Sequence, residues 1–236
     1  MRQVGLSIAP EPLLLARSRY AQPAVVLTWL EGELRLAPPD SDADWQRLLQ
    51  HLALVHSVTP DRMTLHLPWS TINANKAEEG RQIVQQQLTA LPTGTGPAGL
   101  EGLLQRFEAA QWPQWPTAPI CLCRLDHNIT NYLQRPGQWA LVDWEYSGWG
   151  DPAFDVANMM TRVAYLEVPA WRWDWVLDAY CDLVDDATAS LRIQAYCKIL
   201  TVWWVARLAR YLYEIPRGLD RRLVLILSLR PLASPV

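Results

Sequence analysis

The chain has 236 residues, half of them apolar, and a formal net charge of −3. This composition suffices for one large domain or two small ones with a sizeable core, and it excludes a largely disordered chain. Acidic and basic residues are mixed along the sequence. Dedicated nucleic-acid binders concentrate Lys and Arg on one surface, so we expect no nucleic-acid partner.

The spacing of the cysteines and the lack of a signal-peptide or membrane-span pattern bear on the expected cellular compartment. The cysteines form no Cys-x-x-Cys pair and have no His cluster beside them in the sequence, which argues against a zinc site. No signal-peptide pattern is visible, and the apolar run LVLILSL near the C-terminus is far shorter than a membrane span. We expect a cytoplasmic protein with free thiols and no membrane partner.

The hydrophobic pattern predicts a few short strands among many helices. A β-branched run at residues 25–30 ends in Glu31-Gly32, which indicates a buried strand and a connector. Further strands are expected at residues 119–125, 131–134 and 139–143, the last two joined by an Arg-Pro-Gly turn. Helices are expected at residues 42–57, 74–91, 100–110, 171–184 and 191–215. The predicted fold is α+β and mostly α, without regular βαβ alternation.

Three polar residues with an informative spacing surround the predicted hairpin. In CRLDHNITN, Asp126 is followed five residues later by Asn131, and Asp143 ends the second hairpin strand. Phosphoryl transfer needs a carboxylate that orients a hydroxyl and accepts its proton. It also needs Mg²⁺, which prefers hard oxygen ligands such as one amide and one carboxylate. The strand, loop and hairpin order is expected to bring the three side chains to one edge.

These residues resemble the signature of the aminoglycoside phosphotransferase and choline kinase superfamily, which has a protein-kinase-like fold. The usual His-Gly-Asp, four residues, Asn, hairpin and Ile-Asp-Trp appear here as Arg124-Leu125-Asp126, Asn131 and Val142-Asp143-Trp144. The continuation through Glu145-Tyr146-Ser147-Gly148 to Phe154-Asp155 is more similar to the choline, ethanolamine and thiamine kinase branch. The resemblance extends more loosely over almost the entire chain.

The resemblance implies roles for individual residues. Asp126 would be the catalytic base, and Asn131 and Asp143 would bind Mg²⁺ and, with it, ATP. Trp29 and Leu30 would lie at the hinge that contacts adenine. Arg124 replaces the usual His and could hold the loop through hydrogen bonds to carbonyl groups.

Two acidic residues after the hairpin are expected to be structural. Asp151 precedes Pro152 and is a natural helix N-cap, while Asp155 falls in the first helical turn, where it could also brace the loop.

The implied acceptor is a hydroxyl of a small, possibly cationic alcohol such as choline, ethanolamine or thiamine. Glu145 is the favoured contact for such a cation, and Trp149 is a second candidate. Several other Trp residues could line a cation pocket, although core packing explains most of them equally well. These aromatic candidates are Trp144, Trp171, Trp173, Trp175, Trp203 and Trp204.

The small lobe expected from this resemblance is largely missing. Only about 25 residues precede the predicted hinge strand, and they contain neither a Gly-rich loop nor a lysine, since Lys76 and Lys198 are the only lysines. We expect residues 1–31 to be residual N-lobe strands and hinge, and residues 32–236 to be the helical C-lobe. The exposed N-lobe edge is expected to promote self-association.

Three functions remain open at this point. The chain could be an ATP-dependent small-molecule kinase impaired by the missing N-lobe, either as an incomplete gene product or as a fragment. It could instead be a non-catalytic kinase-like module that binds a nucleotide or ligand. An antibiotic phosphotransferase of the aminoglycoside type would differ only in its acceptor.

Overall fold

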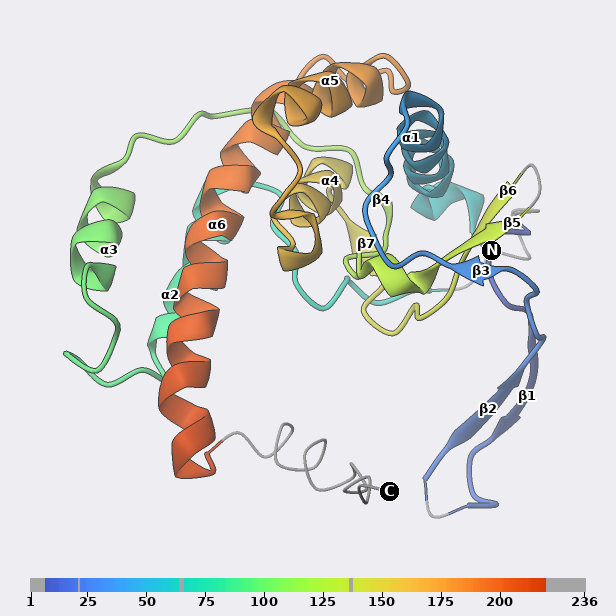
Figure 1. Ribbon diagram of the computed structural model, residues 1–236, viewed down its shortest axis with the longest axis horizontal. Helices are drawn as coiled ribbons and strands as arrows, with labels where there is room; N and C mark the ends of the chain where they lie inside the picture. The colour runs from blue at the N-terminus through green and yellow to red at the C-terminus, as the bar shows by residue number, and fades with distance from the viewer. Residues whose placement is uncertain (1–6, 21, 64–65, 136–137, 220–236) are drawn as a thin grey trace, which may run out of the picture.

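The computed structural model describes residues 7–20, 22–63, 66–135 and 138–219, which form a mostly helical body with small sheets at one end (Figure 1). The α-helices are α1 (Asp42–His56), α2 (Ala77–Leu88), α3 (Leu100–Ala109), α4 (Pro152–Met160), α5 (Ala170–Cys181) and α6 (Ala189–Glu214). The strands are β1 (Pro12–Ala16), β2 (Ala24–Leu27), β3 (Glu33–Leu34), β4 (Cys121–Cys123), β5 (Tyr132–Arg135), β6 (Gln138–Leu141) and β7 (Gly148–Gly150). Single 3₁₀ turns lie at residues 60–62, 129–131, 163–165 and 215–217. The predicted α+β, mostly α fold class is confirmed.

The long helix α6 is the centre of the helical body. It packs between α2 and α4, with α3 and α5 also against it (Figure 1). Its buried positions recur at helical spacing and include Ile193, Tyr196, Ile199 and Trp203, which contribute to one continuous hydrophobic core. The apolar periodicity that predicted this helix therefore marks the side that faces the core.

Helix α1 begins where the sequence predicted it. Ser41 is the N-cap, and its side chain accepts a hydrogen bond from the backbone N–H of Asp44 at 3.2 Å. Trp45, Leu48 and Leu49 are buried at helical spacing after this cap. The helix therefore lays its apolar face on the core and ends at His56, whose side chain is buried beside the loop that follows β4.

The predicted hairpin is the centre of a three-stranded sheet. Strands β5 and β6 pair antiparallel, and β3 adds to the free edge of β5. On the β6 side, the backbone N–H of Leu141 donates to the carbonyl of Ile8 at 2.7 Å, and Ile8 is buried in the core. The chain therefore touches this sheet twice before α1, at Ile8 and again at β3.

A second small sheet, β4–β7, was not foreseen in full. Its partner strand β7 is the Gly-Trp-Gly segment, which pairs antiparallel with β4 in place of the bend suggested by its glycines. Gly148 lies against the backbone of residues 68–70, where an added Cβ would approach Pro68 O and Ser70 N to 2.5 Å. Close backbone approach, rather than a turn, explains this glycine.

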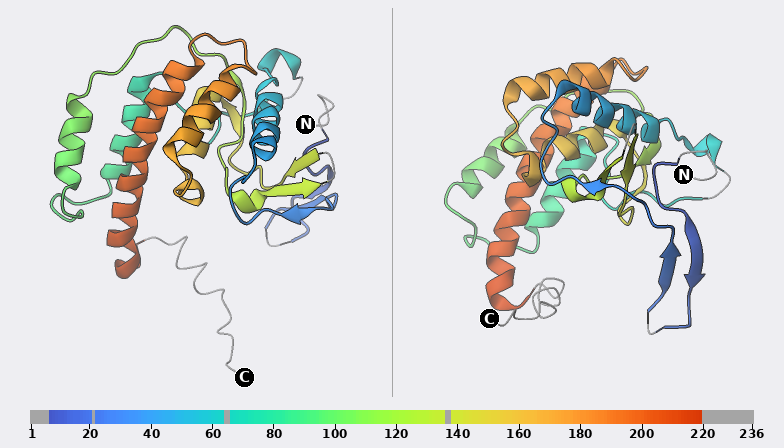
Figure 2. Two further views of the ribbon diagram at one scale, coloured as in Figure 1. Left: turned by 45° about the horizontal axis from the view of Figure 1, so that its top comes forward. Right: turned by 45° about the vertical axis from the view of Figure 1, so that its right-hand side comes forward.

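Strands β1 and β2 form a separate hairpin that projects from the body (Figures 1 and 2). Strand β2 replaces the strand expected at residues 25–30 and ends three residues earlier, at Leu27. Its apolar side chains remain about half exposed instead of forming a buried strand. The exposed apolar residues of the hairpin are Leu13, Leu14, Leu15, Val25, Val26 and Leu27.

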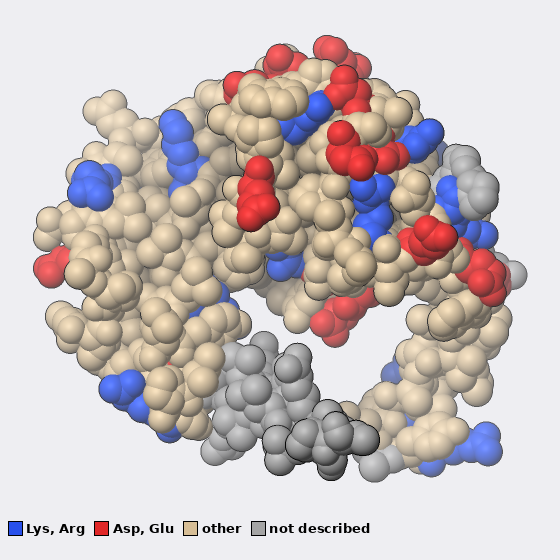
Figure 3. Space-filling view, viewed as in Figure 1, with Lys and Arg blue, Asp and Glu red and all other residues tan. Residues whose placement is uncertain are grey.

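The surface carries no long basic stripe on the face seen in Figure 3, where Lys and Arg are interspersed with Asp and Glu among the described residues. This pattern fits the mixed charge of the sequence. Within residues 7–219, excluding the undescribed gaps, no helix combines the length and hydropathy needed to cross a bilayer. The C-terminal run LVLILSL lies outside the described residues.

Candidate active site

The loop between β4 and β5 brings Asp126 and Asn131 into direct contact. Asn131 Nδ2 donates to Asp126 Oδ2 at 2.7 Å, and the backbone N–H of Asn128 donates to Asp126 Oδ1 at 3.2 Å. A 3₁₀ turn at residues 129–131 reverses the chain and returns the Asn amide to the carboxylate. Asp126 and Asn131 are both largely buried, at 7% and 8% exposure. The five-residue spacing therefore closes a compact polar loop.

Asp143 follows the strand beside this loop and is exposed. The backbone N–H of Val142 donates to the carbonyl of Asn131 at 3.0 Å, so Asp143 is one residue from a direct backbone contact with Asn131. Arg124 Nη2 donates to the carbonyl of Val142 at 2.7 Å. Arg124 thus holds the two segments together through a carbonyl, as the sequence suggested for the residue that replaces the usual His.

Two non-glycine residues of the site adopt left-handed backbone conformations. Leu125 has φ +60° and Asp143 has φ +62°. Such angles are uncommon outside Gly, Asn and Asp, and they are least expected for a bulky apolar residue. Leu125 stands where the resembling signature has Gly and directly precedes Asp126. The backbone is therefore held in an unfavourable conformation next to the proposed base, and the residues that hold it can be identified.

Asp155 holds the loop from the first turn of α4. Its carboxylate accepts the backbone N–H groups of Arg124 and Leu125, each at 2.8 Å. It also contacts the ring nitrogens of His127 at 2.7 Å and His56 at 3.0 Å. Asp155 is fully buried, so these contacts replace its hydration. The bracing role expected for Asp155 is confirmed, and its extension to His56 on α1 was not foreseen.

The pKa of the Asp155 carboxyl reflects this cluster. Burial alone would raise the pKa, but the charges and hydrogen bonds of His127 and His56 outweigh burial and hold it well below its usual range. His56 Nδ1 is in turn 2.7 Å from the hydroxyl of Tyr180 on α5. The loop is therefore tied through one ionised carboxylate to α1, α4 and α5.

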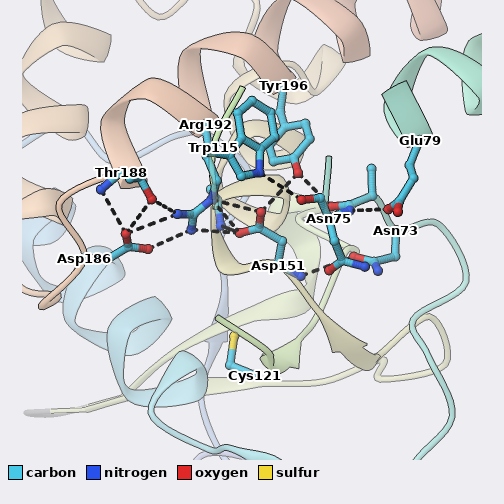
Figure 4. A network of polar contacts seen from close by, with 12 residues as sticks. Asn73, Asn75, Glu79, Trp115, Cys121, Asp151, Asp186, Thr188, Arg192 and Tyr196 are labelled. Atoms are coloured by element: carbon cyan, nitrogen blue, oxygen red, sulfur yellow. Dashed lines mark hydrogen bonds and ion pairs between the residues drawn. The ribbon is translucent and has the colours of Figure 1, made fainter. Parts of the chain in front are cut away.

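Asp151 organises a second buried network, shown in Figure 4. It caps α4 by accepting the backbone N–H of Ala153 at 2.8 Å, which confirms its predicted N-cap role. Arg192 on α6 reaches Asp151 through Nε at 3.0 Å and Asp186 through Nη2 at 2.7 Å, while Tyr196 donates its hydroxyl to Asp151 at 3.0 Å. The network fixes α4 to α6, and thereby fixes the position from which Asp155 reaches the loop.

The site can be assessed as a magnesium site from its donor atoms. Asn131 commits its amide nitrogen to Asp126, which leaves Oδ1 as its ligand atom, and Asp143 offers an exposed carboxylate on the neighbouring segment. Hard oxygen donors of this kind fit Mg²⁺.

A softer donor set also comes together nearby. Atoms of His56, Cys121 and Cys123 lie within 4.8 Å of one another. Both ring nitrogens of His56 already contact Tyr180 and Asp155, which leaves no uncommitted nitrogen for a metal. No sequence signal predicted that a His would lie beside these two cysteines, and a metal bound there would have to break one of the His56 contacts.

The predicted hinge residues are placed at the base of the projecting hairpin. Trp29 is 84% exposed and Leu30 is partly buried. Directly after them, residues 31–33 line an open cavity of about 700 Å³ together with Arg47 and Trp139. Their assignment to adenine binding remains a prediction.

The two predicted acceptor contacts occupy different environments. Glu145 is exposed in the turn that follows Asp143. Trp149 is only 7% exposed and is part of the hydrophobic core, where β7 packs against β4. An acceptor role for either residue remains a prediction, and the surroundings of Trp149 are those of a packing residue.

Arg162 is the site residue that sequence reasoning missed. It lies just after α4, 36 residues beyond Asp126, and its Nη2 donates to Asp126 Oδ1. Its side chain is 21% exposed, and its guanidinium carbon lies 5.9 Å from the centre of the Trp204 ring. The local sequence MTRVAY gave no signal for this contact, because only the packing of α4 brings Arg162 to the loop.

Three solved structures that share this fold are distant from the chain in sequence. A choline/ethanolamine kinase family protein from Mesorhizobium loti aligns with a TM-score of 0.63 at 17% identity, over 92% of this chain and 68% of that one. Choline kinase LicA from Streptococcus pneumoniae aligns at 0.53 and 16%, over 93% and 76%. Macrolide 2'-phosphotransferase MphH from Brachybacterium faecium aligns at 0.58 and 17%, over 96% and 75%. At these identities the likeness establishes the kinase-like fold.

The family of the chain is shown by its sequence. Comparison with curated protein sequences yields no significant match. The model of the phosphotransferase enzyme family, by contrast, matches residues 2–193, which include the whole loop, the hairpin and α4. With the loop geometry and the kinase-like fold, this match over most of the sequence shows that the chain belongs to the phosphotransferase enzyme family.

Proposed function

We propose that the protein transfers the γ-phosphoryl group of ATP to a hydroxyl of a small alcohol, with Asp126 as the catalytic base. The observation that carries the proposal is the closed polar loop in which Asn131 donates to Asp126 and Val142 donates to Asn131. Family membership and fold support a phosphotransferase. The acceptor and the activity of this chain are proposals.

The chemistry assigned to the loop is one displacement at phosphorus. Asp126 accepts the proton of the acceptor hydroxyl as the new oxygen–phosphorus bond forms, and the bond between the γ-phosphorus and the bridging oxygen breaks to release ADP. Asn131 and Asp143 would hold Mg²⁺, which when bound neutralises phosphate charge. Asn131 also orients the Asp126 carboxylate through its amide N–H. Trp29 and Leu30 would contact the adenine ring.

The candidate functions differ in the acceptor of the phosphoryl group and in whether an acceptor is used at all. A choline-like alcohol is the acceptor implied by the resemblance, with Glu145 as the cation contact. Related folds include a spectinomycin phosphotransferase solved with ADP and spectinomycin, which is why an antibiotic acceptor is also considered. A kinase-like module that binds a nucleotide or another ligand without transferring a phosphoryl group is the third candidate.

Binding of Mg-ATP tests the proposal before any acceptor is known. Millimolar Mg-ATP should raise the melting temperature, by about 2–4 °C for each 1 kcal/mol of binding stabilisation in a chain of this size. Asp143→Asn should lose the part of the shift that depends on Mg²⁺. Differential scanning fluorimetry with ATP, Mg²⁺ and both together measures the effect. An unchanged melting temperature with Mg-ATP would refute nucleotide-dependent transfer by this chain.

We also propose that the projecting hairpin promotes self-association. Its strands expose apolar side chains on both sides and leave both edges unpaired within the described residues. Sedimentation velocity should show the weight-average mass rising with protein concentration. Leu14→Lys should weaken the association about tenfold or more, because it adds a charge in the cross-strand pair Leu14–Val26.

The control for this prediction is an exposed leucine elsewhere. Leu212→Lys on α6 changes a side chain that is 69% exposed and should leave the association intact. A wild-type chain that stays monomeric over the full concentration range would contradict the prediction.

A further inference from the structure

The charge around Asp126 differs from that expected for a site that binds a cationic alcohol. Arg162 already occupies one side of the Asp126 carboxylate with its Nη2. The guanidinium also lies near the face of Trp204, one of the aromatic rings considered for a cation pocket. A positive charge supplied by the protein therefore already lies beside both Asp126 and the Trp204 ring.

A second guanidinium group, that of Arg124, adds to the positive charge near this loop. Arg124 is fully buried and stacks on Tyr132 and Trp144, with its guanidinium carbon 5.0 and 5.5 Å from the ring centres. Burial lowers the pKa of Arg162, and the nearby charge of Arg124 lowers it further, whereas Tyr165 opposes the shift. The two positive charges are therefore close enough to affect each other.

Several polar atoms of this region have no hydrogen-bond partner. They are Arg162 Nε, Arg124 Nε and Nη1, and the hydroxyl of Tyr165, all buried and unpaired within the part of the chain that the structure describes. Unpaired buried N–H groups are costly, and a guanidinium offers five donors in a planar fork that matches a carboxylate. Arg162 uses Nη2 for Asp126 and retains donor capacity beside it.

Carboxylates also lie near these guanidinium groups, and Asp155, whose charge acts on Arg124, is committed to backbone N–H groups and two His rings. Asp126 is engaged by Arg162 and Asn131. Asp143 and Glu145 are both exposed, and Asp143 is the residue assigned to Mg²⁺. The charged group that contacts the base is therefore the Arg162 guanidinium.

We propose that Arg162 selects the acceptor, and that the hydroxyl presented to Asp126 belongs to a small hydroxy acid whose carboxylate is recognised by Arg162. This inference rests on the proposed function, because it assumes that the acceptor binds at Asp126. Like-charge repulsion from Arg162 and Arg124 disfavours choline, whereas a carboxylate gains charge-assisted hydrogen bonds. Arg162 is a specificity residue in this scheme, and Asp126 keeps its role as base.

Direct binding of three small alcohols tests the inference without requiring turnover. Hydroxybutyrate, choline and dimethylbutanol, the neutral isostere of choline, are titrated into the full chain by calorimetry with and without Mg-ADP. Hydroxybutyrate should bind at least about tenfold more tightly than choline, with dimethylbutanol between them. Equal affinities for the three, including no detectable binding of any, would overturn the inference, as would a preference for choline.

Variants separate recognition from folding. Arg162→Gln should bring the affinities for hydroxybutyrate and choline to within about twofold, whereas Arg162→Lys should retain a preference for the anion because it retains the charge. Arg81→Gln is the matched control, since Arg81 is also ion-paired and its side chain is 22% exposed against 21% for Arg162. If Arg162→Gln still prefers hydroxybutyrate over choline to the same degree, another residue determines the selectivity.

The outcomes also distinguish this inference from the proposed function. Faster Mg-ATP-dependent phosphorylation of choline than of hydroxybutyrate would refute the hydroxy-acid acceptor and leave the kinase function standing. Binding of hydroxybutyrate that depends on Arg162, without any phosphoryl transfer, would establish the acceptor subsite and refute the kinase function of this chain.

Discussion

Replacing Asp126 with Asn should reduce phosphoryl transfer by about 10²–10⁴-fold, the contribution typical of a positioned general base, while the fold is retained. The amide oxygen of the variant can still accept from Arg162 and from the backbone N–H of Asn128, and its NH2 group then faces the side-chain amide of Asn131, which can turn to present its oxygen. ADP release, measured with the acceptor identified by calorimetry, gives the rate, and the melting temperature reports the fold.

Asp174→Asn provides the matched control for this variant. Asp174 is an exposed carboxylate on α5, so its replacement removes one negative charge without touching the loop. It should leave the rate and the melting temperature unchanged. Undiminished turnover in Asp126→Asn would show that another group accepts the proton, whereas a large fall in melting temperature would make the loss of rate a folding effect.

Replacing Asp155 with Asn should destabilise the protein by about 3–5 kcal/mol, as expected when one partner is removed from a buried charged cluster. The carboxylate accepts hydrogen bonds from two backbone N–H groups and contacts two His rings, whereas an amide places a donor against one of these groups. Chemical denaturation measures the free energy of unfolding, and Asp174→Asn again serves as the control. A difference below about 1 kcal/mol would show that the cluster is not the brace of the loop.

The same cluster predicts the direction of a pH effect. The pKa of Asp155 is lower in the folded protein than its ordinary value of 3.8, so its ionisation stabilises the folded state above that pH. This stabilisation is lost as the pH falls below 3.8 toward the folded-state pKa. The stability difference between wild type and Asp155→Asn should therefore be largest near neutral pH and shrink in acid.

Local patterns were sufficient to predict much of the fold. Helices α1 and α6 were predicted to within two residues at their ends, because apolar periodicity and capping residues are local signals. Strand β7 was missed because its glycines suggested a bend, whereas they serve a close approach to residues 68–70. That contact joins segments about 80 residues apart, which no local pattern encodes.

In the candidate site, too, local contacts were predicted and contacts made by tertiary packing were not. The spacing of Asp126 and Asn131 predicted their contact, since a loop of five residues with a turn can close on itself. The contacts of His56 with Asp155 and of Arg162 with Asp126 were not predicted, because α1 and the segment after α4 reach the loop only through tertiary packing. The charge that surrounds a bound substrate therefore depends on tertiary contacts that local sequence patterns do not encode.

The two tethers of the β1–β2 hairpin have a mechanical consequence. The chain segment that enters the hairpin is fixed at Ile8, beside β6. The segment that leaves the hairpin is fixed at β3, beside β5 of the same sheet. With strands about 4.8 Å apart, the tethers are separated by roughly 14 Å across the sheet. A hairpin suspended from two points pivots about the line that joins them instead of swivelling freely. We therefore expect any tilt of the hairpin to reach the sheet near Asn131, which precedes β5, and near Asp143, which follows β6.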